Sequence, residues 1–251
     1  MKRSRLLINF IPLILLLLSI AFLFFRGFFY AAVGLGALLI ILTVKYLVEK
    51  NSSNPWLPFI FSPLLVFLGG EFYAIFLSNY FYLLAIFLVI IWFVYSYLRN
   101  LYYYLAYGAP EREKKIDSLL LSGGFISVWA FASALFNIQA FLNWPFWLLL
   151  LIFAPFVWLS FAYFSWWQKN FSSAGLAIFF NTVVLLELTW VLSLLPLNYN
   201  ILGFLLALFY YFLLFSLRLS WRRELNRRRL RLVLVGSSII IFLILLTAAW
   251  L

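Results

Sequence analysis

Long apolar runs alternate with short polar interruptions along the whole chain. Each run approaches the roughly 20 residues that a helix needs to cross the hydrocarbon core of a bilayer, which is about 30 Å thick. Charged residues, Asn, Gly and Pro separate about nine such runs. We therefore predict an all-α fold, a polytopic transmembrane helix bundle. The predicted spans are residues 6–25, 28–48, 57–77, 80–98, 118–137, 144–164, 174–195, 199–217 and 232–250.

Composition supports a membrane location and narrows the available chemistry. Of the 251 residues, 67% are hydrophobic and 10% are charged, which leaves too little polar surface for a water-soluble globule of this size. Histidine and cysteine are absent. Their absence excludes histidine acid–base catalysis, cysteine nucleophiles, and imidazole or thiolate metal sites. We expect no catalytic residues, no metal site and no cofactor, so an enzyme is disfavoured.

The positive charges predict the orientation of the bundle. If the basic amino terminus lies in the cytoplasm, every second loop is cytoplasmic, and 17 of the 18 lysines and arginines fall inside. Only Arg26 falls outside, a division that follows the positive-inside rule. We predict a multi-pass protein of the cell membrane with a cytoplasmic amino terminus and an extracytoplasmic carboxyl terminus. The first span would be an uncleaved signal anchor, because its apolar run exceeds that of a signal peptide.

We expect residues 1–251 to form a single membrane domain whose two halves resemble each other. Residues 1–99 and 118–218 would be copies of a four-helix unit in the same orientation, as in parallel-repeat transporters. Residues 232–251 would add one more helix. The alternative is that a few polar matches arise by chance in an apolar chain. The matching pairs are Lys50 and Lys169, Glu71 and Glu187, and Arg99 and Arg218, at offsets of 119, 116 and 119 positions.

Two glutamates within predicted spans are the strongest candidates for a functional site. Glu71 and Glu187 each lie in the outer half of a span, where a carboxylate costs about 2.5–3.5 kcal/mol. Each should therefore be protonated, paired or face a polar cavity, and Arg26 is the candidate partner. The repeat predicts that both point inward at similar depth. Their role is either a proton, cation or substrate site, or a structural one: to fix helix register or to reach the outer headgroups.

The loop after the eighth predicted span carries seven arginines, interleaved with leucines and a tryptophan. This pattern predicts contact with anionic headgroups of the cytoplasmic leaflet, each cation contributing about 1 kcal/mol. The alternatives are a topology determinant solvated among headgroups and a site for a phosphate-bearing substrate. We expect no nucleic acid partner. The seven are Arg218, Arg222, Arg223, Arg227, Arg228, Arg229 and Arg231.

The last third of the chain combines a polar helix end, a tyrosine pair, a basic loop and a short closing motif. These are residues 187–196, Tyr210-Tyr211, the arginine-rich loop and residues 247–250. In this combination the chain resembles a group of uncharacterised multi-pass inner-membrane proteins of small-genome bacteria. The resemblance implies a bacterial inner membrane and no particular activity. It also groups Glu187, Trp190 and Pro196 at the outer end of one helix.

Three functions are compatible with these features of the sequence. The leading one is a non-enzymatic membrane protein with an assembly, accessory or scaffold role, because the loops are too short to hold a soluble catalytic domain. The second is a secondary transporter for a small or lipophilic solute that uses Glu71 and Glu187. The third is a lipid-handling membrane enzyme that uses the arginine-rich loop. The partners we expect are the anionic cytoplasmic leaflet and either another membrane protein or a second copy of the chain.

Overall fold

The computed structural model describes residues 2–24, 26–52, 55–168, 171–221, 235–236 and 238–239. The prediction of an all-α fold is confirmed, because long helices account for most of this part of the chain. The elements are α1 (Lys2–Phe24), the 3-10 turn η1 (Arg26–Phe28), α2 (Phe29–Asn51), α3 (Leu57–Ala74), α4 (Tyr80–Tyr107), α5 (Pro110–Leu142), α6 (Phe146–Trp167), α7 (Phe171–Ser193) and α8 (Tyr199–Trp221).

Seven of these helices, α2 to α8, are long and apolar enough to cross a membrane, and α1 contains a shorter apolar stretch, Leu7–Ala21. The chain is therefore built as a polytopic helical membrane protein. Each of the first eight predicted spans falls on one of these helices. The ninth, residues 232–250, lies almost wholly outside the described residues. The count of nine spans and the orientation remain predictions.

Two helices, α4 and α5, exceed the lengths that the apolar pattern predicts by the largest margin. α4 continues past residue 98 to Tyr107, and α5 begins at Pro110 rather than at residue 118. The reason is that a charged residue such as Arg99 does not end a helix. Gly108 ends α4 instead, because its φ of 60° is left-handed and its N–H donates to the Tyr104 carbonyl. At 28 and 33 residues, the two helices are about 42 and 50 Å long, so both extend beyond the hydrocarbon core.

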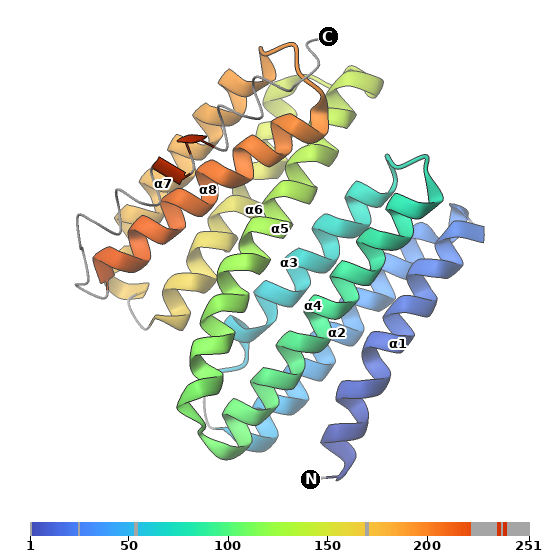
Figure 1. The fold of residues 1–251 in the computed structure, drawn as a ribbon, viewed down its shortest axis with the longest axis vertical. Coiled ribbons are helices and arrows are strands. Elements are labelled where there is room, and N and C mark those ends of the chain that lie inside the picture. Colours follow the sequence, from blue (N-terminus) through green and yellow to red (C-terminus); the bar gives the residue numbers. More distant parts are fainter. Residues whose placement is uncertain are drawn as a thin grey trace. The chain divides into compact units, whose positions relative to one another are not determined.

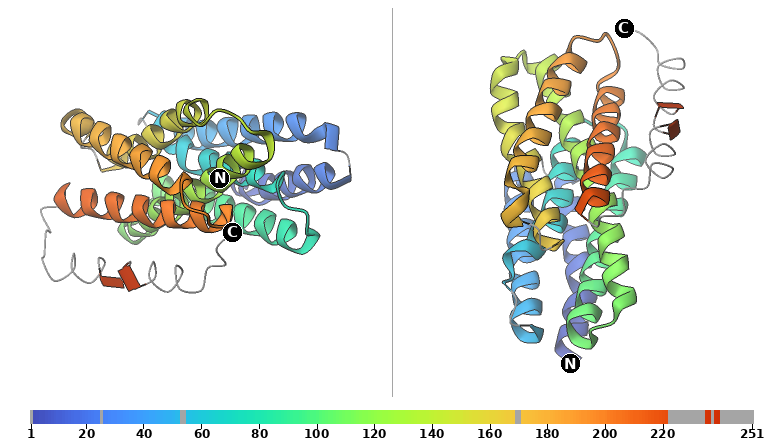
Figure 2. Two further views of the ribbon diagram at one scale, coloured as in Figure 1. Left: turned by 90° about the horizontal axis from the view of Figure 1, so that it is seen from above. Right: turned by 90° about the vertical axis from the view of Figure 1, so that its left-hand side faces the viewer.

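The chain divides into two compact units, Met1–Ser127 and Val128–Leu251, and the boundary falls within α5. In the first unit, α1 packs on α2 and α4, and α3 also packs on α2 and α4 (Figure 1). In the second unit, α7 packs on both α6 and α8 (Figure 2). The single domain and the tandem repeat of residues 1–99 and 118–218 remain predictions.

Each unit has its own buried core, in which tyrosines join neighbouring helices. In the first unit, the buried Tyr97 of α4 donates a 2.9 Å hydrogen bond to the Phe59 carbonyl of α3. In the second, the buried Tyr210 of α8 donates to the Ser160 carbonyl of α6 at 3.3 Å. A buried phenol requires such a partner, because an unmade hydrogen bond in an apolar core costs about 1–3 kcal/mol. These bonds fix the register of the helices that they join.

Candidate functional site

Glu71 lies inside the first unit, near the end of α3. Its side chain is 1% exposed. The Ser19 hydroxyl of α1 donates a hydrogen bond to Oε1 at 2.5 Å, and Ser19 also lies 3.0 Å from the Leu15 carbonyl of its own helix. One carboxyl oxygen of Glu71 thus accepts a hydrogen bond from a residue of α1 that lies 52 positions earlier in the sequence.

Two glycines allow the helices around Glu71 to approach each other closely. A Cβ on Gly70 would collide with the Ile90 side chain of α4, and a Cβ on Gly36 of α2 would collide with Phe67 of α3. Small residues at such crossings are how membrane helices pack without a hydrophobic driving force. Glu71 is therefore enclosed by tight helix packing on the side of α4.

The second carboxyl oxygen of Glu71, Oε2, is buried and has no hydrogen-bond partner among the described residues. Arg26, the predicted partner, belongs to η1 in the same unit, but its side chain lies outside the described part, so the pairing remains a prediction. The arrangement can hold a protonated or hydrogen-bonded carboxyl, and it leaves one oxygen available to a further donor.

Glu187 has a different environment from Glu71. It belongs to the second unit and is exposed on α7, where the repeat predicts an inward-facing side chain. Its neighbours one helical turn away on the same face, Val184, Trp190 and Val191, are exposed as well. The difference arises because Glu187 lies about half a turn around α7 from the buried Leu185 and Thr189, and so on the face opposite the packed one.

Other polar side chains of α7 are satisfied within their own helix. Asn181 donates to the Ala177 carbonyl, Thr182 to that of Ile178 and Thr189 to that of Leu185, at 2.7–2.8 Å. These bonds are typical of polar residues in apolar helices, because they remove the need for an external partner. Glu187, by contrast, makes no hydrogen bond with the described residues.

Of the seven arginines predicted to contact anionic lipid, the structure describes one. Arg218 lies in the last turn of α8, where a cation also interacts favourably with the helix dipole. The six others, Arg222, Arg223, Arg227, Arg228, Arg229 and Arg231, lie outside the described residues. The lipid contact and the lipid-handling alternative therefore remain predictions.

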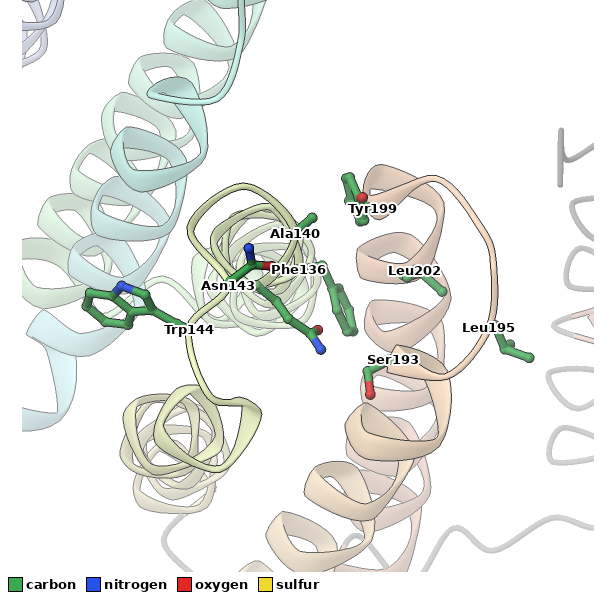
Figure 3. A pocket seen from close by; sticks show the side chains of 9 residues that line it. Phe136, Ala140, Asn143, Trp144, Ser193, Leu195, Tyr199 and Leu202 are labelled. Atoms are coloured by element: carbon green, nitrogen blue, oxygen red, sulfur yellow. The ribbon is translucent and has the colours of Figure 1, made fainter. Parts of the chain in front are cut away.

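A neutral polar pocket that the sequence did not predict lies in the second unit, at the end of α5 and the start of α8 (Figure 3). Gln139, Asn143, Ser193 and Tyr199 contribute amide and hydroxyl groups to its lining, while the ring of Trp144 points away from Phe136 and Ser193 (Figure 3). Asn143 has a φ of 50°, a left-handed conformation that asparagine tolerates. The signal in the sequence was this asparagine between two helices, followed by tryptophan and proline.

The comparisons with other proteins supply no further assignment of these residues. No family model, curated protein or solved structure matches the chain.

Proposed function

We propose that the chain is a non-enzymatic subunit of a membrane assembly, and that a partner membrane helix binds the face of α7 around Glu187. One observation supports this proposal most directly. Glu187 is an acidic side chain on an exposed face at predicted membrane depth, and it has no hydrogen bond with the described residues. A carboxylate facing lipid carries an insertion cost of about 2.5–3.5 kcal/mol near the centre of the core. A partner that donates a hydrogen bond removes much of this cost.

The surroundings of Glu187 suit a helix rather than a soluble ligand. The exposed apolar side chains of α7 recur every three to four residues, so they form one stripe along the helix. The stripe comprises Leu176, Phe179, Phe180, Val184, Trp190 and Val191. A second helix can pack along these side chains while one polar pair at Glu187 sets the register, since interhelical hydrogen bonds contribute about 0.6–2 kcal/mol in membranes.

The partner is expected to carry a hydrogen-bond donor at the matching depth. Glu187 lies about 9 Å before the end of α7 at Ser193, taking 1.5 Å per residue. A carboxylate there is best matched by Arg or Lys, or by Asn, Gln or Ser, in the outer half of the partner helix. The competing explanation is that the Glu187 side chain reaches the outer headgroups and needs no protein partner.

Site-specific photocrosslinking in intact membranes tests the proposal. A photoreactive residue replaces Trp190, one turn from Glu187, and a control replaces Trp92 on the exposed face of α4. We expect position 190 to give a discrete protein crosslink that Glu187→Leu abolishes, whereas the pattern at position 92 stays unchanged. The crosslinked peptide should be an apolar helix that contains a donor; a crosslinked species of twice the chain's mass would identify a second copy as the partner, whereas a crosslink within one chain would contradict a separate partner. Lipid adducts alone at position 190 would contradict the proposal.

A proton-coupled transporter is the second candidate, and it rests on Glu71 rather than on a glutamate pair. The observation in its favour is the buried Oε2, which has no hydrogen-bond partner within the described part of the chain, because a carboxyl with one oxygen available can exchange a proton. Proteoliposomes that contain the full chain and a pH-sensitive dye provide the test. Faster collapse of an imposed pH gradient, abolished by Glu71→Gln and kept by Glu187→Gln, would support transport. An unchanged rate relative to empty vesicles would exclude it.

A further inference from the structure

A second pocket lies in the first unit, between the beginning of α1 and the second half of α4. Its volume is about 180 Å³. At 1.5 Å per residue, Arg99 is about 28 Å along α4 from Tyr80, which is close to the full thickness of the hydrocarbon core. The pocket therefore lies at headgroup level, on the cytoplasmic side in the orientation that the positive charges predict. Its lining residues are Ile8, Asn9, Tyr95, Arg99, Tyr102 and Tyr103.

Two polar groups of this pocket have no hydrogen-bond or ion-pair partner among the described residues. The Arg99 guanidinium lies 6.0 Å from the centre of the Tyr95 ring, and no ion pair within the described residues includes it. Tyr102 is 1% exposed, and its hydroxyl makes no hydrogen bond in the part of the chain that the structure describes. Leaving a buried hydroxyl unsatisfied is unfavourable. Both groups are suited to a ligand oxygen that carries negative charge.

A second arginine adds positive charge beside the pocket. The Arg112 guanidinium lies 5.1 Å from the centre of the Tyr103 ring, and Nη1 donates a 3.1 Å hydrogen bond to Oδ1 of Asn100. These two contacts hold Arg112 against a residue that lines the pocket. Arginine is the side chain best suited to phosphate and carboxylate groups, because its planar guanidinium presents paired donors.

Exposed apolar side chains lead from the pocket toward the membrane core. On α1, Leu13 and Leu17 follow Asn9 at intervals of four residues and are exposed. On α4, Trp92 is seven positions before Arg99, so it lies on the same face of the helix, and it is also exposed. A ligand with a charged head in the pocket and acyl chains would meet apolar surface on both helices, whereas a free anion would use the pocket alone.

We propose that this pocket binds the phosphate group of an anionic membrane lipid. Arg99 and the amide of Asn9 donate to phosphate oxygens, and the Tyr102 hydroxyl, which is otherwise unsatisfied, supplies a further donor. The acyl chains lie along Leu13, Leu17 and Trp92. The volume suits one phosphate with part of its headgroup, since pockets for drug-sized ligands are larger, about 300–1,000 Å³. The site is independent of the partner surface on α7.

Thermal unfolding of the full chain in detergent tests this assignment. The probes are dioctanoyl phosphatidylglycerol, dioctanoyl phosphatidylcholine and inorganic phosphate, and the proteins are wild type, Arg99→Gln, Tyr102→Phe and the control Lys114→Gln. Lys114 is exposed and does not line the pocket. We expect phosphatidylglycerol to raise Tm in a saturable way. Its half-saturating concentration should increase about tenfold or more in Arg99→Gln, about threefold to fivefold in Tyr102→Phe, and less than twofold in Lys114→Gln.

Tyr102→Phe separates ligand binding from a structural role. Without lipid, this variant should be at least as stable as wild type, because it removes an unsatisfied buried hydroxyl. It also decides the outcome if Arg99→Gln does not fold. If the half-saturating lipid concentrations of Arg99→Gln and Tyr102→Phe match that of Lys114→Gln, the proposal is overturned in favour of general surface charge. An equal effect of phosphatidylcholine would overturn the assignment of an anionic lipid, and a full effect of inorganic phosphate would identify free phosphate as the ligand instead.

Discussion

Glu71 and Glu187 are the same residue type at positions that the predicted repeat would match, and the structure gives them opposite environments. Glu71 is buried against α1 and held by Ser19, whereas Glu187 is exposed on α7. Gly70 precedes Glu71 and lies against Ile90 of α4, so α3 is closely packed at this point. Glu187 instead lies about half a turn around α7 from the buried Leu185 and Thr189, on an exposed face of the helix. The environment of a membrane carboxyl thus depends on which face of its helix is packed as much as on its depth.

The largest effect should come from enlarging the glycine beside Glu71. Gly70→Leu forces a side chain into Ile90 and should destabilise the protein by about 2–3 kcal/mol through overpacking. The matched control is Gly175→Leu in α7, where no atom lies within 4 Å of the position that a Cβ would occupy. There the change should stabilise by about 0.5–1 kcal/mol through helix propensity. Unfolding by SDS in mixed micelles measures both, and equal losses would mean that the two helices are packed alike.

A smaller loss is expected when Glu71 loses its donor. Ser19→Ala leaves Oε1 buried without its hydrogen bond and should cost about 1–3 kcal/mol. Ser122→Ala is the control, because this exposed hydroxyl bonds only within its own helix, to the Leu119 carbonyl at 3.2 Å. The same mixed-micelle titration should show a change below about 0.5 kcal/mol for the control. If Ser19→Ala is equally harmless, the Ser19–Glu71 bond does not stabilise the first unit.

Glu187 should tolerate substitution in the isolated protein. Glu187→Gln keeps the shape of the side chain and touches no described hydrogen bond, so the free energy of unfolding should change by less than about 0.5 kcal/mol. The measurement uses purified protein, where no partner is present. A loss as large as that of Ser19→Ala would show that Glu187 is held within its own fold, and the contrast with Glu71 would then disappear.

The positive-inside orientation places both glutamates toward the same, outer side of the membrane. Because the chain contains no cysteine, single replacements report accessibility directly. Ser78→Cys and Pro196→Cys, in the exposed connections after α3 and α7, should both react with an impermeant maleimide in intact cells, whereas Lys114→Cys should not. We expect neither Ser78→Cys nor Pro196→Cys to change the free energy of unfolding by more than about 0.5 kcal/mol. Labelling at only one of the two outer positions would break the correspondence between the helices.

The apolar pattern was enough to predict the all-α fold and to locate the first eight helices, because each run is long and its interruptions are sharp. It could not give the true ends of α4, since the helix continues through Arg99 to the glycine cap at Gly108. The apolar pattern also could not predict Ser19 as the partner of Glu71, because Ser19 is distant in sequence and its approach depends on tertiary packing. The pocket at Arg99 had a partial signal, because Tyr95, Arg99 and Tyr102 recur on one helical face.

The composition of α3 has a consequence for how the protein enters the membrane. This helix has 18 residues, contains Pro63, Gly69, Gly70 and Glu71, and has the lowest mean hydropathy of the seven long apolar helices. Such a segment partitions into lipid poorly by itself. The more apolar α4 begins only a few residues later, at Tyr80, and α1 has by then presented Ser19. We therefore expect α3 to leave the translocation channel paired with α4 as a helical hairpin, with its carboxyl already shielded by neighbouring helices.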